Sequence, residues 1–356
     1  MRSSMLIGWF ADIGLRDRLE VGGKGGSLGE LQRAGIAVPP GFVVKTAAFE
    51  RFMQSLERES PVRERVQSLN AADMAGMTVL SKDLRARFAA APLPSDAAEA
   101  IAAAHAALVG GAAQMAAGAA QPAVAVRSSA TAEDASDASF AGMQDTYLWV
   151  KSLSLAQDMV RSCWGSLYSV ESISYRRRRG FVEKDVSMAV VVQSMVDARS
   201  AGVMFTRSPL TGDRSVMAIE GSWGLGSAVV GGEVTPDRWV VGKITGEISV
   251  REISTKLIRH AAAAAGGAET VPVPEELQCV ASLSDDEIQT LRTIGRKVER
   301  HYGRPQDIEW AVDPHGDILL LQSRPETVWS AKDAIPVARA AADPSSHVLS
   351  IFGGRR

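Results

Sequence analysis

The sequence predicts an α+β protein, with a helical N-terminal lobe followed by a lobe rich in strands. Two observations carry this prediction. Residues 46–120 are mostly of helical character, with a long alanine-rich tract, whereas residues 186–253 contain short apolar runs separated by turn residues. With 356 residues and 46% hydrophobic content, the chain is long enough for two domains or for one large domain with two lobes.

Composition excludes several classes of protein. A formal net charge of −2 argues against a nucleic-acid binder that works by broad neutralisation of phosphates. The chain contains no run of eighteen apolar residues, so we expect no membrane span, and its first ten residues are too short an apolar run for a signal peptide. Cys163 and Cys279 fit buried thiols better than a disulfide, and we therefore expect a cytoplasmic protein.

The first lobe is expected to span residues 1–190. Its predicted elements are a glycine-rich turn leading into a helix over 21–34, a turn and short strand over 36–44, and an amphipathic helix over 50–66. An alanine-rich helical tract follows over 86–120, with interruptions expected at Pro92, Pro94 and Gly110-Gly111. The lobe continues with a strand at 123–126, a polar loop, a helix over 155–179 and an apolar strand over 186–196.

The second lobe is expected to span residues 191–330, with 331–356 as a tail or linker. Strands are predicted at 202–206, 216–220 and 239–242, and Thr245-Gly246 suits a hairpin turn. A helix over 284–302 begins with Ser284 as its N-cap and with Glu287 placed for a capping box. Two final strands flank the turn sequence 313–317.

Lys24 stands among four glycines at positions 22, 23, 25 and 26. The segment does not match the phosphate loop G-x-x-x-x-G-K-[ST], because no four-residue arch precedes the lysine. A lysine among glycines can still place an ammonium group beside an anion, with backbone N–H groups close to it. A flexible turn before a helix explains the same residues, so the segment alone leaves both interpretations open.

Arg127 ends a predicted strand and leads into a loop of small and hydroxyl residues that continues to Thr146. Arginine at a strand end offers a two-pronged contact to phosphate, and small residues let backbone N–H groups approach phosphate oxygens. A plain surface loop with a solvated arginine is the alternative.

Glu309 and Gln322 lie on the two final strands, which a turn joins. Antiparallel neighbours can direct both side chains to one point, and a carboxylate with an amide oxygen suits Mg²⁺. Arg324 falls on the same face as Gln322 because it lies two residues further along the strand. A solvated hairpin with outward charges is the alternative when the pair is considered alone.

Together these segments resemble the nucleotide-binding domain of the phosphoenolpyruvate synthase and pyruvate phosphate dikinase family, to which the ATP domain of rifamycin phosphotransferases also belongs. The resemblance covers roughly residues 8–330. It rests on Gly-Gly-Lys-Gly, Val-Arg-Ser-Ser-Ala-Thr-Ala-Glu-Asp, Ser-Phe-Ala-Gly, Gln-Ser-Met-Val, Ala-Gly-Val-Met-Phe-Thr, Gly-Leu-Gly, Asp-Ile-Glu-Trp and Gln-Ser-Arg-Pro-Glu-Thr, in this order. It implies an ATP-grasp-type fold in which two lobes hold the nucleotide.

The resemblance also implies the roles of individual residues. Lys24 and Arg127 would contact phosphates, Arg324 would stabilise the phosphate in transfer, and the loop ending in Gly142 would cover it. The carboxylate and amide of the two final strands would hold Mg²⁺. Met143 stands where many relatives of the synthase branch have glutamine.

The base and sugar of ATP would contact the middle of the chain. By the same resemblance Gln193, Met195 and Val196 would line the adenine pocket, and Glu220 would meet the ribose or a metal.

In the family that the chain resembles, ATP phosphorylates a histidine on a separate domain with the signature Thr-Ser-His-Ala, and AMP and phosphate form in the synthase-type members. None of the five histidines has this context: His105, His260, His301, His315 and His347. We therefore expect a partner that carries the histidine, as for the ATP-binding subunit of phenylphosphate synthase. An excised ATP domain of a synthase or antibiotic phosphotransferase, and a nucleotide sensor without turnover, are the alternatives.

Overall fold

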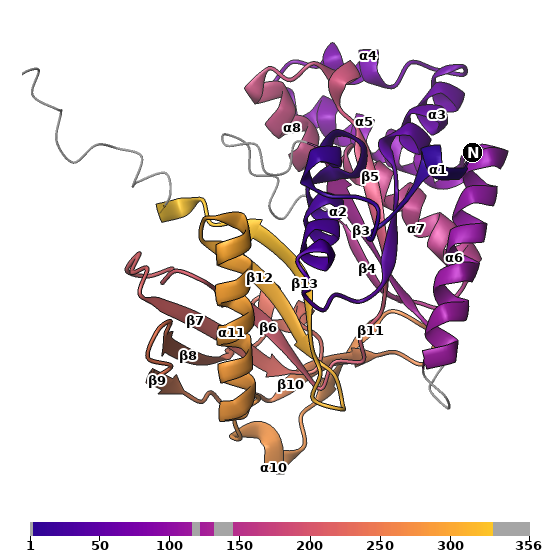
Figure 1. Ribbon diagram of the computed structural model, residues 1–356. Helices are drawn as coiled ribbons and strands as arrows, with labels where there is room; N and C mark the ends of the chain where they lie inside the picture. The colour runs from indigo at the N-terminus through magenta and orange to yellow at the C-terminus, as the bar shows by residue number, and fades with distance from the viewer. Residues whose placement is uncertain (1–2, 116–121, 132–144, 330–356) are drawn as a thin grey trace, which may run out of the picture.

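The computed structural model describes residues 3–115, 122–131 and 145–329, which form two antiparallel sheets and a two-stranded hairpin (Figure 1). The first sheet has the order β1-β2-β5-β3-β4, with bounds Ile7–Trp9, Gly41–Val44, Met188–Ser194, Val124–Ala130 and Thr146–Val150. The second has the order β13-β12-β6-β7-β8-β9, with bounds Ile318–Pro325, Gln306–Val312, Ser200–Phe205, Val216–Trp223, Asp237–Gly242 and Ile248–Glu252. A mixed α and β protein is thus confirmed.

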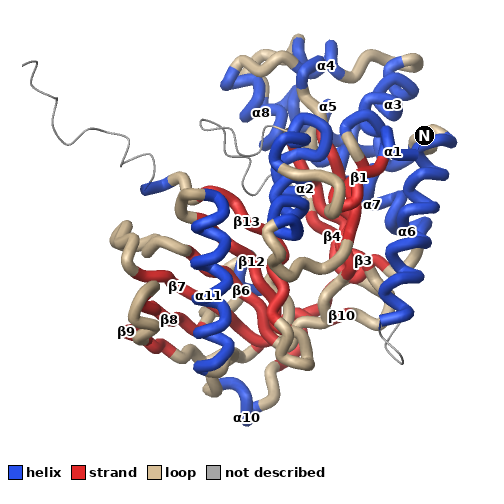
Figure 2. Tube along the Cα trace, in the orientation of Figure 1, coloured by secondary structure: helices blue, strands red, loops and turns tan. Residues whose placement is uncertain are grey.

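Most helices belong to the lobe of the first sheet, as Figure 2 shows by their blue colour. They are α1 (Ser3–Leu6), α3 (Thr46–Glu57), α4 (Arg63–Gln67), α5 (Met74–Ala90), α6 (Ser95–Met115), α7 (Leu153–Ser166) and α8 (Val170–Arg179), with 3₁₀ turns at Leu15–Asp17 and Glu183–Asp185. Phe52 packs edge-to-face against Phe88 and in a tilted arrangement against Trp164, with ring centroids 5.4 and 5.1 Å away. These aromatic contacts join α3, α5 and α7 in one apolar core.

The helix α6 passes through Gly110 and Gly111 without a break, so the interruption expected there is wrong. The alanines on both sides have the highest helix propensity, which offsets about 1 kcal/mol for each glycine. The helix expected over 155–179 is instead two helices, since Ser169 caps α8 by accepting a hydrogen bond from the Ser172 N–H.

The glycine-rich segment is part of α2 (Arg18–Arg33), whose regular course breaks at Gly22 with a φ of 71°. A Cβ at Gly22 would lie 2.1 Å from the carbonyl oxygen of Ser129, so only glycine fits this contact. Leu28 and Leu31 are fully buried, which confirms the helical spacing after the turn. In Figure 1, α2 lies where the two lobes meet.

The second sheet is covered by α11 (Asp285–Tyr302), with the short helices α9 (Ser227–Val230) and α10 (Glu275–Gln278) nearby. The predicted capping box is confirmed, because Ser284 and Glu287 exchange side-chain and backbone hydrogen bonds. The β8–β9 hairpin turns at Gly246, where φ is 75°, and the final turn between β12 and β13 is confirmed as well.

Four strands have no counterpart in the sequence prediction: β1, β4 and the hairpin of β10 (Ile258–Ala262) and β11 (Ala268–Pro272). The tip of this hairpin contacts the first lobe. There, the Lys151 ammonium donates to the carbonyl oxygens of Ala263 and Ala264, and the Gly267 N–H donates to the Trp149 carbonyl.

The chain passes from the first sheet to the second between Ser194 and Ser200, a few residues after the expected lobe boundary at 190. Both cysteines are free thiols, but only Cys163 is buried; Cys279 is exposed after the surface helix α10, so the expectation of burial is wrong there. Among the described helices, none has the length and apolar character needed to cross a membrane.

Candidate functional site

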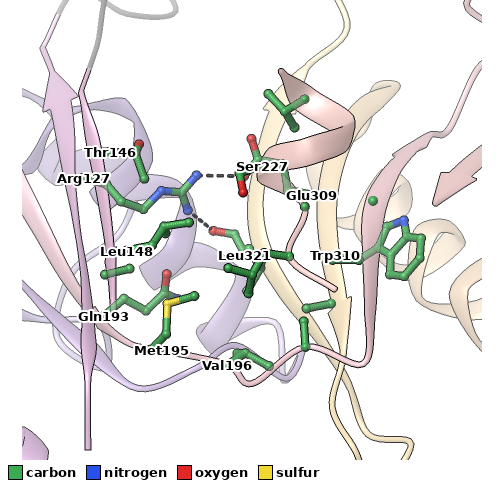
Figure 3. A pocket seen from close by; sticks show the side chains of 18 of the residues that line it. Arg127, Thr146, Leu148, Gln193, Met195, Val196, Ser227, Glu309, Trp310 and Leu321 are labelled. Atoms are coloured by element: carbon green, nitrogen blue, oxygen red, sulfur yellow. Dashed lines mark hydrogen bonds and ion pairs between the residues drawn. The ribbon is translucent and has the colours of Figure 1, made fainter. Parts of the chain in front are cut away.

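A cavity lies between the two sheets and takes its walls from both (Figure 3). Arg127 and Gln193 line it from the first sheet, and Glu309 lines it from the second. Thr146, Ser227 and Glu309 lie at the end near Arg127, while Met195 and Val196 line the opposite end, with Gln193 beside Met195. A largely apolar pocket with a few converging polar groups is typical of a small-molecule site.

Arg127 reaches across the cavity from β3 to the second sheet. Its Nη1 donates to the Leu321 carbonyl at 2.7 Å, and its Nη2 donates to Glu309 Oε2 at 2.8 Å and to Gln322 Oε1 at 2.7 Å. The side chain is buried, and its Nε has no hydrogen-bond partner among the described residues. Arg127 therefore joins the two sheets across the cavity and places a positive charge at its polar end.

Glu309 and Gln322 are direct partners in the register of β12 and β13. The same row continues through Val203 of β6 to Glu220 of β7. Directly opposed residues share one face of an antiparallel sheet, so the three polar side chains of this row face the first lobe. Glu220 lies two strands beyond Glu309 and is not among the residues that line the cavity.

Arg324 pairs with Asp307 at the next position on this face, with Arg324 Nε 3.5 Å from Asp307 Oδ2. Arg324 is half exposed and lies outside the cavity lining. Burial raises the pKa of Asp307 to about 6. The positive charge of Arg324 lowers this pKa, and the negative charge of Glu326 raises it by a smaller amount. Asp307 Oδ1 is buried and unpartnered within the described chain.

Sequence reasoning assigned no role to Asp307. The signal that could have found it is its alternation with Glu309, since residues two apart on a strand share a face. The structure thus adds one carboxyl group to the predicted polar face.

Lys24 is buried on α2 and does not line the cavity itself. Burial and the charge of Asp145 hold the pKa of the Cys163 thiol well above its ordinary value, and the charge of Lys24 partly opposes this effect. The turn is fixed to β3, since the Gly25 N–H donates to Ser129 Oγ at 3.1 Å. Ser129 lies two residues after Arg127 on the same face of β3, so the turn adjoins the polar end of the cavity.

The residues expected to contact adenine do line one cavity. Gln193 is buried, and its Nε2 donates to the Pro39 carbonyl at 3.2 Å, while Met195 and Val196 follow where the chain leaves β5. Gly142, expected to end a covering loop, lies outside the described residues.

The oxygens of Glu309 and Gln322 both lie within hydrogen-bond distance of one Arg127 nitrogen, so they converge on one point. In the described part of the chain, no group of three or more His, Cys, Asp or Glu side chains could hold a metal ion. Mg²⁺ commonly takes one or two protein oxygens and completes its shell with water and phosphates. Glu309 and Gln322 supply oxygens of this kind, but the point on which they converge is held by Arg127 Nη2 in this structure, so a metal ion there requires the guanidinium to move aside.

The family described as pyruvate phosphate dikinase, AMP/ATP-binding domain, matches residues 18–343, almost the whole chain. The chain belongs to this family. The match includes the glycine-rich helix α2 and every strand of both sheets except β1, so the expectation of an ATP-binding domain from this family of phosphotransferases is confirmed.

Relatives of this pyruvate phosphate dikinase family are similar over nine-tenths of the chain. A probable phosphoenolpyruvate synthase of Methanothermobacter thermautotrophicus is 42% identical over 321 residues, which are 90% of this chain and 46% of that protein. The phosphoenolpyruvate synthase of Aeropyrum pernix is 39% identical over an alignment of 368 positions, which covers 92% of this chain and 43% of that protein. A rifampicin phosphotransferase of a Streptomyces species is 40% identical over 326 residues, which are 91% of this chain and 36% of that protein. The chain thus spans less than half of each.

Proposed function

We propose that the chain binds Mg-ATP between its two sheets, in an ATP-grasp-type arrangement, and phosphorylates a histidine on a partner carrier protein or domain. The observation that carries this proposal is Arg127, which extends from the first sheet to Glu309 and Gln322 on the second. A guanidinium group, a carboxylate and an amide at one end of an apolar cavity suit a ligand with an anionic tail and a flat apolar head.

Different residues of the chain would contact the different parts of the nucleotide. Adenine would lie against Met195 and Val196 beside Gln193. Arg127 would supply positive charge for the phosphates, and Lys24 and Arg324 would add to it at the same end. Glu309 and Gln322 would hold Mg²⁺, whose charge would offset that of the phosphates.

The proposed reaction converts ATP, water and a histidine to AMP, phosphate and phosphohistidine. Such transfers depend on positioning and on charge neutralisation, which the converging groups supply. The histidine would come from a further domain, as in a phosphoenolpyruvate synthase or rifamycin phosphotransferase, or from a separate subunit, as in phenylphosphate synthase. A cytoplasmic location belongs to the same proposal. A sensor without turnover is less favoured, because Arg127, Glu309 and Gln322 are placed together.

The test uses the purified chain with Mg-ATP and a carrier domain that bears the histidine. We expect little AMP from the chain alone and a marked increase when the carrier is added, followed by chromatography of the nucleotides. A carrier with the histidine replaced by alanine is the control. Rapid AMP formation without a carrier would contradict the proposal.

A further inference from the structure

Three side chains of the second lobe form a hydrogen-bonded series outside the roles assigned above. Ser227 Oγ lies 2.8 Å from His260 Nδ1, and His260 Nε2 lies 3.2 Å from Glu233 Oε2. The backbone fixes the series as well, because the Leu225 N–H donates to the His260 carbonyl at 3.0 Å. A Cβ at Gly224 would lie 2.4 Å from that carbonyl oxygen, so the approach depends on glycine.

Ser227 stands where two cavities meet. It lines the cavity of Arg127 and Glu309, in which Figure 3 shows it beside Glu309, and it also lines a neighbouring cavity with His260 and Glu233. Its hydroxyl is therefore placed at the wall of the proposed nucleotide site, with the imidazole and the carboxylate behind it.

The series has a definite polarity when the imidazole is neutral. The Glu233 side chain is half exposed, and as a carboxylate it only accepts hydrogen bonds, so His260 Nε2 carries the proton and donates. His260 Nδ1 then accepts from the Ser227 hydroxyl. The remaining lone pairs of Ser227 Oγ are left to accept a hydrogen bond from a ligand.

We propose that Ser227 determines specificity by accepting a hydrogen bond from a ribose hydroxyl of the nucleotide, and that His260 and Glu233 are positioning residues that fix this polarity. The inference rests on the proposed function. A sugar hydroxyl can donate, whereas ionised phosphate oxygens cannot, and the carboxylate behind the imidazole opposes an anion. The sugar also joins the base to the phosphates, so it adjoins the polar end of the cavity, where Ser227 lies beside Glu309.

The experiment measures binding of ATP, 2′-deoxy-ATP and 3′-deoxy-ATP, each with Mg²⁺, to the full chain by titration calorimetry. For the wild type we expect ATP to bind about fivefold more tightly than at least one deoxynucleotide, the effect of one hydrogen bond. Ser227→Ala should remove this difference by weakening ATP and the deoxynucleotide that keeps the contacting hydroxyl, while binding of the other deoxynucleotide stays unchanged. His260→Ala should reduce the difference, and His260→Asn, whose amide oxygen can accept from Ser227, should restore most of it.

Thr146→Val is the matched control, because it removes a hydroxyl from the same cavity at the edge of the first sheet and should preserve the discrimination. Thermal unfolding of each variant verifies the fold. Equal weakening of all three nucleotides by Ser227→Ala, or a wild type without discrimination, would overturn the inference. A wild type that binds no Mg-ATP at all would instead overturn the proposed function itself, so the two failures are distinguishable.

Discussion

The guanidinium group of Arg127 contacts three acceptors on two strands of the opposite lobe, although the residue itself belongs to β3. Its ion pair with Glu309 is largely shielded from water on the arginine side. Such a forked, shielded contact is stronger than an exposed ion pair, which contributes about 0–1 kcal/mol. The strand pattern and the order of motifs predicted that Arg127, Glu309 and Gln322 act together. The sequence could not predict their direct contact, because this contact depends on how the two sheets face each other.

Replacement of Glu309 by alanine tests the proposed metal pair. We expect Glu309→Ala to keep the fold, since Arg127 retains Gln322 and the Leu321 carbonyl, and to lose Mg²⁺-dependent phosphoryl transfer by a factor of about 100 or more. Circular dichroism and AMP formation with a carrier domain measure the two effects. Glu252→Ala, on the exposed edge strand β9, is the acidic control. Unchanged transfer in Glu309→Ala would refute the assignment.

Asp307 predicts a pH dependence of stability. Its pKa is raised from 3.8 to about 6, so the folded state binds the proton more tightly than the unfolded state. The free energy of unfolding should therefore fall by about 1–3 kcal/mol as pH rises from about 4 through 6, relative to Asp307→Asn. Urea unfolding of both proteins across this range measures the difference. Parallel curves for the two proteins would contradict the raised pKa.

At the scale of elements, the sequence predicted structure best where a residue has a well-defined local role, such as capping a helix or forming a turn. Ser284 and Glu287 predicted the start of α11, and the turn at 313–317 predicted the final hairpin. Sequence patterns did not predict elements whose position depends on contacts between residues far apart in the chain. The hairpin β10–β11 contains mostly half-exposed positions with no alternating apolar pattern, so no local signal marked it.

Two glycines in helices provide a matched pair of predictions. Gly22→Ala should destabilise the protein by on the order of 3 kcal/mol, because φ is positive and the new Cβ meets Ser129. Gly110→Ala should stabilise it by about 0.5–1 kcal/mol, because α6 continues through this position and, among the described residues, no atom outside the backbone of α6 lies within 4 Å of the added carbon. Chemical denaturation compares the two. Similar effects of both substitutions would show that the turn at Gly22 tolerates a side chain.

Across the whole molecule, each of the two sheets has its own apolar core, and α2 contacts both lobes. Ser27 on α2 donates to the Ser323 carbonyl at 2.6 Å, while the turn before it is fixed to Ser129 of the first sheet. The sequence predicted two lobes but not this shared helix, since its buried face contacts residues about 100 and 300 positions away. Long-range contacts of this kind leave no local pattern.

Ligand binding should therefore be visible as stability of the whole molecule. With free Mg-ATP at about 100 times its Kd, the free energy of unfolding should rise by about 2.7 kcal/mol. ATP with EDTA should give a much smaller rise, because the phosphates lose their counter-charge. Arg127→Lys should lose most of the gain with Mg-ATP, since lysine has one charged centre in place of the fork. Unfolding followed by tryptophan fluorescence measures each case, and equal gains with and without EDTA would exclude a metal-dependent site.

The contact between the β10–β11 hairpin and the first lobe has a consequence for access to the cavity. The two lobes are fastened on one side by α2 and on the other by Lys151 and Trp149 against the hairpin tip. The sheets cannot move apart at the hairpin side while those hydrogen bonds persist. Widening of the cavity there requires the tip of a short surface hairpin to detach, which is a small and local event compared with the unfolding of either core.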